Sequence, residues 1–222
     1  MPVSVGHGGG LSYLEIAPPD APRDLPLVVT LHGRGASAED LAPLAPELDG
    51  ERYRFIFPNG RLRLDLGGWE GFAWYNVGEQ AADLPASRVA VEALLRDLWA
   101  RTGLGAARTV LLGFSQGAVL TLDVGLRSAK RFAGLVAMSG YLYEDADLTA
   151  ALARAQDQRV LIVHGTYDEV LTVDRGRAAR QALEAAGLRP EYHEFPMGHE
   201  VTGASLAVVR EFLHAVLPVA EG

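Results

Sequence analysis

The stretch VLLGFSQGA at residues 110–118 decides how this chain folds. An apolar, strand-like run over residues 109–114 leads into Gly-x-Ser-x-Gly, and residues 116–126 can form a helix. This order is the pattern of a nucleophile elbow, a tight strand-to-helix turn that holds a serine in a strained backbone conformation. Glycines are needed on both sides of the serine because side chains there would clash with the strand and the helix. We therefore predict that the hydroxyl of Ser115 projects from the carboxyl edge of a sheet.

Strands and helices alternate on either side of this elbow. Apolar runs predict further strands over residues 12–16, 27–31, 54–57, 134–138, 160–164 and 191–195. Helical spacing predicts helices over residues 91–98, closed by Gly103, over residues 174–186, between an N-cap at Thr172 and Gly187, and over residues 206–216, ended by Pro218. The alternation predicts an α/β fold with a mostly parallel central sheet and helices on both faces. We expect the polar strand 191–195 near one edge of the sheet and strand 12–16 at the opposite side.

The composition is that of an ordinary globular protein. Of the 222 residues, 49% are hydrophobic and 22% are charged, and this length suits one domain over residues 1–222. The net charge of −8 does not support nucleic-acid binding. No apolar run approaches the roughly 20 residues of a membrane span, and residues 1–11 lack a signal-peptide pattern. Cysteine is absent, which excludes disulfides, a cysteine nucleophile and thiolate metal sites. We expect a cytoplasmic protein, either a monomer or a homodimer.

An acid and a base follow the serine in the order that an activated nucleophile needs. A serine hydroxyl attacks well only when a base takes its proton and a third group orients that base. Asp168 follows the strand 160–164, and His199 follows the strand 191–195. Because the carboxyl ends of parallel strands meet at one edge of a sheet, we predict a catalytic triad of Ser115, Asp168 and His199.

Other residues compete for these roles. Glu169 could replace Asp168, although Asp168 lies closer to the strand end. His193 competes with His199, but it falls inside a predicted strand and should project from the face of the sheet. We expect a structural role for His164, a tail position for His7 and a helix surface for His214. A metal site of His164, Asp168 and His199 would leave the serine unexplained, so we predict no metal.

The sequence also offers donors for a developing negative charge. The turn geometry aims the backbone N–H of Gln116 at the place where a substrate oxygen would become negative. The run LHGRG at residues 31–35 is a glycine-containing loop after a strand, and we assign the second N–H to Arg34. The guanidinium of Arg34 could instead lie at the rim of the site. We expect His32 to brace the loop and Ser37 to cap the following helix.

The segment 60–85 is long, irregular and apolar. It contains Trp74 and Tyr75 together with Leu62, Leu64, Leu66, Trp69 and Phe72, so it must pack against other parts of the protein. It could cover a part of the core that lacks a helix, or it could form one wall of an acyl pocket. On the second interpretation the tentative pocket residues are Trp74 and Tyr75, joined by Tyr141 after the strand 134–138.

Taken together, these motifs resemble the phospholipase/carboxylesterase family of α/β-hydrolases, which includes acyl-protein thioesterases and small bacterial carboxylesterases. The resemblance extends from residue 27 to the last helix and is carried by LHGRG (31–35), FPNG (57–60), AWYN (73–76), GFSQG (113–117), SGY (139–141), HGTYD (164–168) and MGHEV (197–201). It implies an α/β-hydrolase fold without a large lid domain and a cofactor-free serine hydrolase. The triad residues and the two backbone donors named above match the family's.

The resemblance implies a substrate class, a small-molecule ester with a short or medium acyl chain, or a thioester. The chain departs from the family's usual residues at Asn76, at Tyr167 and at Leu171-Thr172. We place Asn76 and Tyr167 at the rim of the pocket. Two alternatives stay open: a non-catalytic ligand-binding protein on a hydrolase scaffold, and a peptidase or dienelactone-hydrolase-like enzyme.

Overall fold

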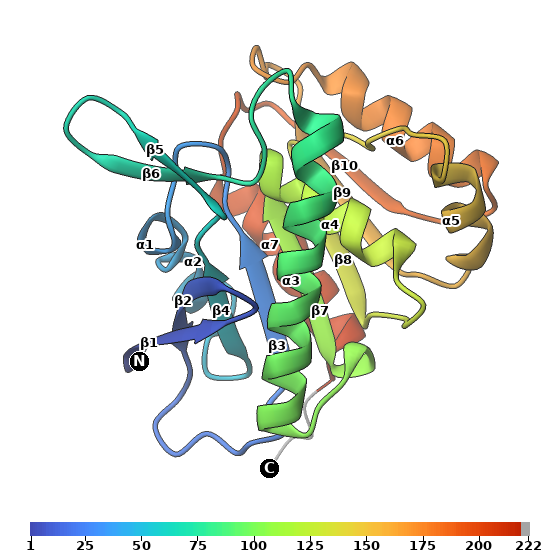
Figure 1. The fold of residues 1–222 in the computed structure, drawn as a ribbon. Coiled ribbons are helices and arrows are strands. Elements are labelled where there is room, and N and C mark those ends of the chain that lie inside the picture. The colour runs from blue at the N-terminus through green and yellow to red at the C-terminus, as the bar shows by residue number, and fades with distance from the viewer. Residues whose placement is uncertain (219–222) are drawn as a thin grey trace.

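A sheet of eight strands forms the centre of the protein, in the order β1-β2-β4-β3-β7-β8-β9-β10 (Figure 1). The computed structural model describes residues 1–218, so residues 219–222 of the expected domain lie outside the described part. The strands are Val3–Gly8 (β1), Leu11–Ile16 (β2), Leu27–Leu31 (β3), Arg54–Pro58 (β4), Thr109–Phe114 (β7), Gly134–Met138 (β8), Val160–Gly165 (β9) and Glu191–Phe195 (β10).

Six of these strands, β3, β4 and β7 to β10, run parallel, whereas β1 and β2 pair antiparallel. The mostly parallel sheet predicted from the sequence is therefore confirmed, and β10 lies at an edge as expected. Because the parallel strands point the same way, their carboxyl ends and the loops that follow gather at the top of Figure 1.

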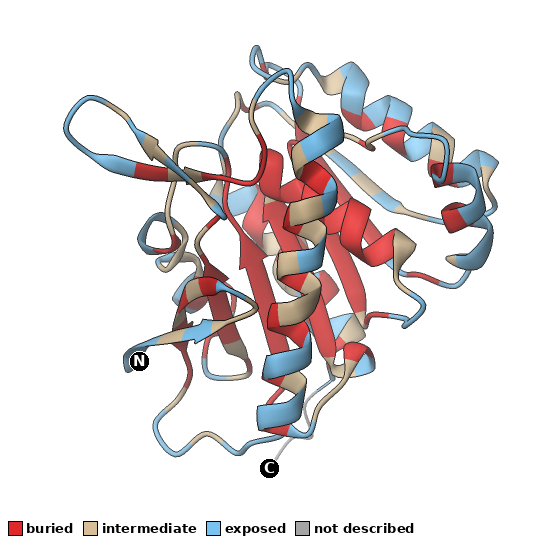
Figure 2. Ribbon diagram, viewed as in Figure 1, coloured by how far each residue is buried: buried red, intermediate tan, exposed pale blue. Residues whose placement is uncertain are grey.

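Helices cover both faces of the sheet and bury its side chains (Figure 2). Their bounds are Ala38–Leu41 (α1), Leu44–Glu47 (α2), Gln80–Thr102 (α3), Gln116–Arg127 (α4), Leu148–Arg154 (α5), Val173–Ala185 (α6) and Gly203–Val216 (α7). Side chains of α3 to α6 pack in one apolar cluster, and those of α1, α2 and α7 in another. The five residues of β3 are fully buried, with Val29 in the first cluster and Val28 in the second. None of the helices among residues 1–218 combines the length and apolar character needed to cross a bilayer.

One strand was missed in the sequence. β1 pairs with β2 across a two-residue turn, where Gly9 and Gly10 have φ angles of +57° and +78°. Two positive φ values define the type I′ turn that joins twisted strands, and glycine adopts them without strain. β1 is the outer edge strand, so the expected N-terminal strand lies second from that edge. His7 consequently lies in this edge strand and not in a tail.

The prediction that residues 60–85 are irregular is wrong. The segment forms a hairpin of Leu62–Asp65 (β5) and Glu70–Ala73 (β6), and α3 begins at Gln80. The hairpin projects from the body of the molecule at the upper left of Figure 1. Pro85 lies inside α3 beyond its first turn, so its missing N–H removes one hydrogen bond of the helix, which continues through it. The described residues contain no large lid domain, as the sequence predicted.

Candidate active site

Ser115 occupies the turn between β7 and α4 in a conformation that only a tight elbow imposes. Its φ of +54° and ψ of −118° lie in a region that side-chain-bearing residues rarely adopt. A Cβ on Gly113 would lie 2.1 Å from the carbonyl oxygen of Gly117, and a Cβ on Gly117 would lie 2.0 Å from that of Leu31. The two flanking glycines are therefore required by backbone packing, which is the reason for the spacing in the sequence.

The structure brings Ser115, His199 and Asp168 into one hydrogen-bonded chain. The Nε2 atom of His199 lies 2.9 Å from the Oγ atom of Ser115, and its Nδ1 atom lies 2.7 Å from Oδ2 of Asp168. A carboxylate only accepts hydrogen bonds, so Nδ1 carries the proton and donates a hydrogen bond to Asp168. Nε2 is then left with a lone pair and accepts the hydroxyl proton of Ser115. This is the arrangement in which an imidazole can act as a base.

Asp168 is held ionised by its surroundings. Burial alone would raise the pKa of this carboxyl, but hydrogen bonds from His199 and from backbone N–H groups lower it below its usual value. Those N–H groups belong to Val170 and Leu171 and donate to Oδ1 at 2.9 and 2.8 Å. Its rival Glu169 is exposed and has no such partners among the described residues. Asp168 is therefore the acid that contacts the base.

The other histidines lie where the sequence predicted, apart from His7. His193 is exposed on β10, and His214 pairs with Asp49 on the surface of α7. His164 is fully buried, and its Nε2 atom lies 2.7 Å from the carbonyl oxygen of Leu171. No cluster of three or more His, Asp or Glu side chains in the described part of the chain fits a metal ion.

Two residues with free backbone N–H groups line the same cavity as the serine. Arg34, Ser115 and Gln116 all line one cavity. Neither the N–H of Arg34 nor that of Gln116 donates to a protein acceptor within residues 1–218. Gln116 is the first residue of α4, so its N–H is one of those that a helix leaves free at its start. This geometry suits a pair of donors to an oxyanion.

His32 braces the loop that carries Arg34. Its Nδ1 atom lies 2.6 Å from the carbonyl oxygen of Gly33, and the backbone N–H of Gly60 donates to its Nε2 atom at 2.8 Å. The ring must be neutral, because Nε2 accepts a hydrogen bond. Burial accordingly lowers the pKa of His32 to about 4, although the carbonyl of Gly33 favours the charged form.

Trp74 supports this loop instead of lining the pocket, so its tentative assignment to the pocket wall is corrected. The side chain is fully buried, and its Nε1–H donates to the carbonyl oxygen of His32 at 2.9 Å. The side chain of Gln116 joins the same support. Its Oε1 atom accepts from the N–H of Trp74 at 3.1 Å, and its Nε2 donates to the carbonyl oxygen of Tyr75 at 2.9 Å. No pattern in the sequence indicates this role for the Gln116 amide.

A cavity of about 300 Å³ opens beside Ser115. Tyr75 and Tyr141, both expected in the pocket, line it, and their hydroxyl oxygens are 3.5 Å apart. Val77 and Val170 also line it, although they are 79% and 68% exposed. Apolar side chains that stay exposed at the mouth of a cavity are suited to contact a ligand.

Sequence reasoning missed two polar residues of this cavity. Gln80, at the start of α3, and Arg175, in the first turn of α6, both line it. In the sequence, only their position just after irregular segments could have indicated that Gln80 and Arg175 line a cavity. Neither Asn76 nor Tyr167 is among the residues that line the cavity, and their placement at its rim stays a prediction. Asn76 donates to Asp83 within its own segment.

Comparisons with known proteins identify the family of this chain. Residues 11–217 match the family model described as Phospholipase/Carboxylesterase. The chain is 31% identical to acyl-protein thioesterase 1 of Kluyveromyces lactis, over 71% of this chain and 76% of that protein. It is 25% identical to acyl-protein thioesterase 1 homolog 1 of Dictyostelium discoideum, over 86% and 90%. The solved structure of esterase PE8 superposes with a TM-score of 0.79 at 31% identity, covering 87% of this chain and 93% of that one.

Proposed function

The chain belongs to the phospholipase/carboxylesterase family and is a carboxylic ester hydrolase with the α/β-hydrolase fold; we propose that it hydrolyses short- to medium-chain carboxylic esters, and the corresponding thioesters, through an acyl-enzyme on Ser115. The family membership expected from the sequence motifs is thereby confirmed. The names of the similar proteins, acyl-protein thioesterase and esterase, support both kinds of substrate.

The observation that carries the proposal is the unbroken chain of contacts from Asp168 through His199 to the hydroxyl of Ser115. Each link has the polarity that proton transfer requires, with Asp168 accepting from the imidazole and the imidazole accepting from the hydroxyl. A serine in a structural turn needs no such partners. The strained backbone of Ser115 is a second support, because strain of this kind is retained where function demands it.

In the first step, His199 takes the hydroxyl proton while Oγ of Ser115 attacks the carbonyl carbon of the ester. The carbonyl oxygen becomes negative and accepts hydrogen bonds from the N–H groups of Arg34 and Gln116. His199 then gives its proton to the departing alcohol or thiol, which leaves the acyl group bonded to Ser115. Asp168 keeps the imidazole in the required tautomer and stabilises its positive charge.

In the second step, water replaces the alcohol. His199 accepts a proton from the water as its oxygen attacks the acyl carbon, and the same two N–H groups hold the second oxyanion. Collapse of this intermediate returns the proton to Oγ of Ser115 and releases the acid. No cofactor is needed at any point.

The size of the cavity supports the proposed acyl length. At about 300 Å³ it falls at the lower end of the range for small-molecule sites. A short acyl group fits this space, while a long chain would have to extend beyond the exposed side chains of Val77 and Val170.

The test is the Ser115→Ala variant assayed on p-nitrophenyl butyrate. We expect kcat to fall by on the order of 10⁴ or more with unchanged folding, because the oxyanion donors and binding alone leave only residual catalysis. Ser128→Ala is the matched control, since Ser128 lies at the opposite end of the same helix. A variant that keeps more than a tenth of wild-type activity would refute the assignment.

Labelling with a fluorophosphonate separates the proposal from its alternatives. A hydrolase reacts at Ser115, whereas a folded protein that stays unlabelled would be a ligand-binding protein on the same scaffold. A panel of peptides and lactones assayed beside the esters distinguishes a peptidase or dienelactone-hydrolase-like enzyme. One hydrolase domain, a cytoplasmic location and a monomeric or homodimeric state stay predictions from the sequence.

A further inference from the structure

The cavity beside Ser115 is positively charged in a protein that is otherwise acidic. The chain carries a net charge of −8. Even so, Arg34 and Arg175 both line this cavity, and no Asp or Glu of residues 1–218 does. Neither guanidinium forms an ion pair with a carboxylate in the described part of the chain. By contrast, Arg177 and Arg180, on the same helix as Arg175, are both paired. The cavity therefore has unmatched positive charge next to the nucleophile.

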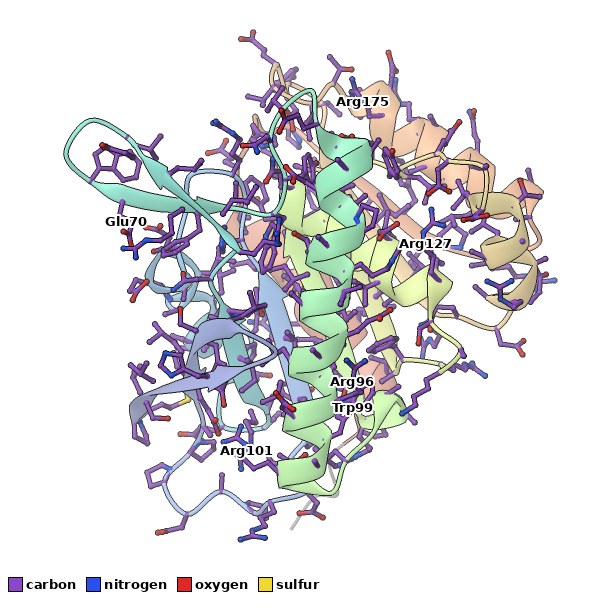
Figure 3. The ribbon with its side chains drawn as sticks, in the orientation of Figure 1. Glu70, Arg96, Trp99, Arg101, Arg127 and Arg175 are labelled. Carbon is purple, nitrogen blue, oxygen red and sulfur yellow. The ribbon has the colours of Figure 1, made fainter. Side chains whose placement is uncertain are left out.

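Arg175 is held in place from one side. Its Cζ atom lies 4.8 Å from the centre of the Tyr141 ring, so the guanidinium stacks on an aromatic face. The hydroxyl of Tyr141 donates in turn to Oε1 of Gln80 at 2.9 Å. Figure 3 labels Arg175 at the top of the view, beside the N-terminal end of α3 where Gln80 lies. A stacked guanidinium keeps its N–H groups free for a planar anion.

Gln80 adds an unused donor to the same wall. Its Nε2 atom is buried and has no hydrogen-bond partner within residues 1–218. An amide nitrogen only donates, so the missing partner is an acceptor. Burying a donor without an acceptor is unfavourable, and this donor is satisfied when the Gln80 amide turns towards a ligand acceptor in the cavity.

We propose that the preferred substrates are esters whose acyl chain ends in a carboxylate, that is, hemiesters of short dicarboxylic acids. The inference rests on the proposed function, because the acyl carbon is bonded to Oγ of Ser115 in the acyl-enzyme and its chain then occupies the cavity. The methylene groups contact Val77 and Val170, and the terminal carboxylate accepts hydrogen bonds from Arg175 and Gln80. Water supplies the hydroxyl of the new carboxyl group and the proton of the released alcohol.

The test compares two esters that differ only in charge. Monomethyl glutarate carries a carboxylate at the end of its acyl chain, and methyl glutaramate carries a neutral amide of nearly the same shape. Methanol release is measured for both. We expect kcat/KM of wild-type protein to be at least about tenfold higher for the hemiester, the effect of one charge-assisted hydrogen bond. Raising sodium chloride from about 50 to about 500 mM should lower this ratio severalfold.

Variants of α6 assign the preference to one side chain. Arg175→Gln should bring the ratio close to one, whereas Arg180→Gln, which changes a paired arginine on the same helix, should leave it unchanged. Arg175→Glu should reverse the preference, favouring methyl 5-(trimethylammonio)pentanoate over the hemiester. A gain of activity towards a cation cannot come from misfolding.

A wild-type ratio of two or less, or the same ratio in wild type and Arg175→Gln, would overturn this inference and leave the proposed function intact. Loss of methyl glutaramate hydrolysis in Ser115→Ala supports the proposed function whatever the ratio. If wild-type protein hydrolyses none of the three substrates, that is, neither methyl ester and not p-nitrophenyl butyrate, the proposed function is refuted instead.

Discussion

Burial of His32 in its neutral form should make this protein less stable as the pH falls below about 6.5, before its carboxylates titrate. The neutral ring accepts a hydrogen bond from the N–H of Gly60 at its Nε2 atom. A protonated Nε2 would point a second N–H at that donor, inside a fully buried site. The loop that carries the proposed oxyanion donor would then lose its brace, and its attachment to Gly60 with it.

The magnitude follows from the pKa of His32. In the folded protein it is lowered to about 4, mainly by burial, whereas the unfolded chain has the usual value of about 6.5. Because the folded pKa is the lower one, the stabilising contribution is complete above pH 6.5 and is lost as the pH falls towards 4. The difference of about 2.5 units corresponds to about 3 kcal/mol in total, and about 2 kcal/mol of this should be lost between pH 7 and pH 5.

The assay is urea unfolding at pH 7 and pH 5, compared for the wild type and His32→Gln. Glutamine keeps an acceptor but has no proton to gain, so the variant should lose much less stability across this range. His193→Gln is the control, because His193 is exposed and its removal should leave the pH dependence unchanged. An equal loss in wild type and His32→Gln would refute the reasoning. So would an NMR titration of the folded protein in which the imidazole of His32 has a pKa near 6.5.

Three further outcomes test other parts of the structure. Asp168→Asn should lower kcat by on the order of 10⁴ in steady-state kinetics, because an amide cannot hold the triad imidazole in its tautomer, while the melting temperature changes little. A fall in kcat of less than tenfold would contradict the assigned role. Gly117→Ala places a methyl group 2.0 Å from the carbonyl oxygen of Leu31, so the free energy of unfolding in urea should fall by about 1–3 kcal/mol. An unchanged unfolding midpoint would show that the elbow can relax around the methyl group. Asp123→Ala removes the buried carboxylate that pairs with Arg88 and with Arg127, which Figure 3 labels on α4, and should cost about 3 kcal/mol of stability by the same measurement. A neutral effect would mean that Asp145, the other partner of Arg127, is enough to compensate its charge.

The sequence predicted the sheet and the three converging side chains because these follow from local patterns. Five of the six parallel strands are short apolar runs with glycine or proline at or near an end, and the polar β10 lies between Pro190 and Pro196. Each triad candidate follows the end of a parallel strand within a few residues. Gly113 could be interpreted mechanically, since the contact that requires it, with the carbonyl oxygen of Gly117, is made within a single strand, turn and helix. Gly117 is required by the carbonyl oxygen of Leu31 on the neighbouring β3. The triad needs no knowledge of side-chain packing beyond the rule that parallel strands end at a common edge.

Other features depend on contacts that no local pattern reveals. β1 exposes Val3 and Val5 and is rich in glycine, so neither alternation nor apolar content marks it as a strand; the Gly9-Gly10 pair was its one signal. The wall of the cavity is the stronger case. Gln80 and Arg175 come from helices far apart in the chain, and only the packing of α3 and α6 around Tyr141 brings them together.

The distance between the acid and the base is fixed by the backbone, which explains why a triad can be built from two loops. β9 and β10 are neighbours in the sheet, and their pairing continues past the last strand residues. The N–H of Thr166 donates to the carbonyl oxygen of Phe195 at 2.8 Å, and that of Tyr167 donates to Met197 at 3.1 Å. A Cβ on Gly165 would lie 2.3 Å from the Met197 carbonyl oxygen, so glycine is what allows the two loops to approach. The loops that carry Asp168 and His199 are therefore an extension of the sheet itself, and their side chains meet with little freedom to separate.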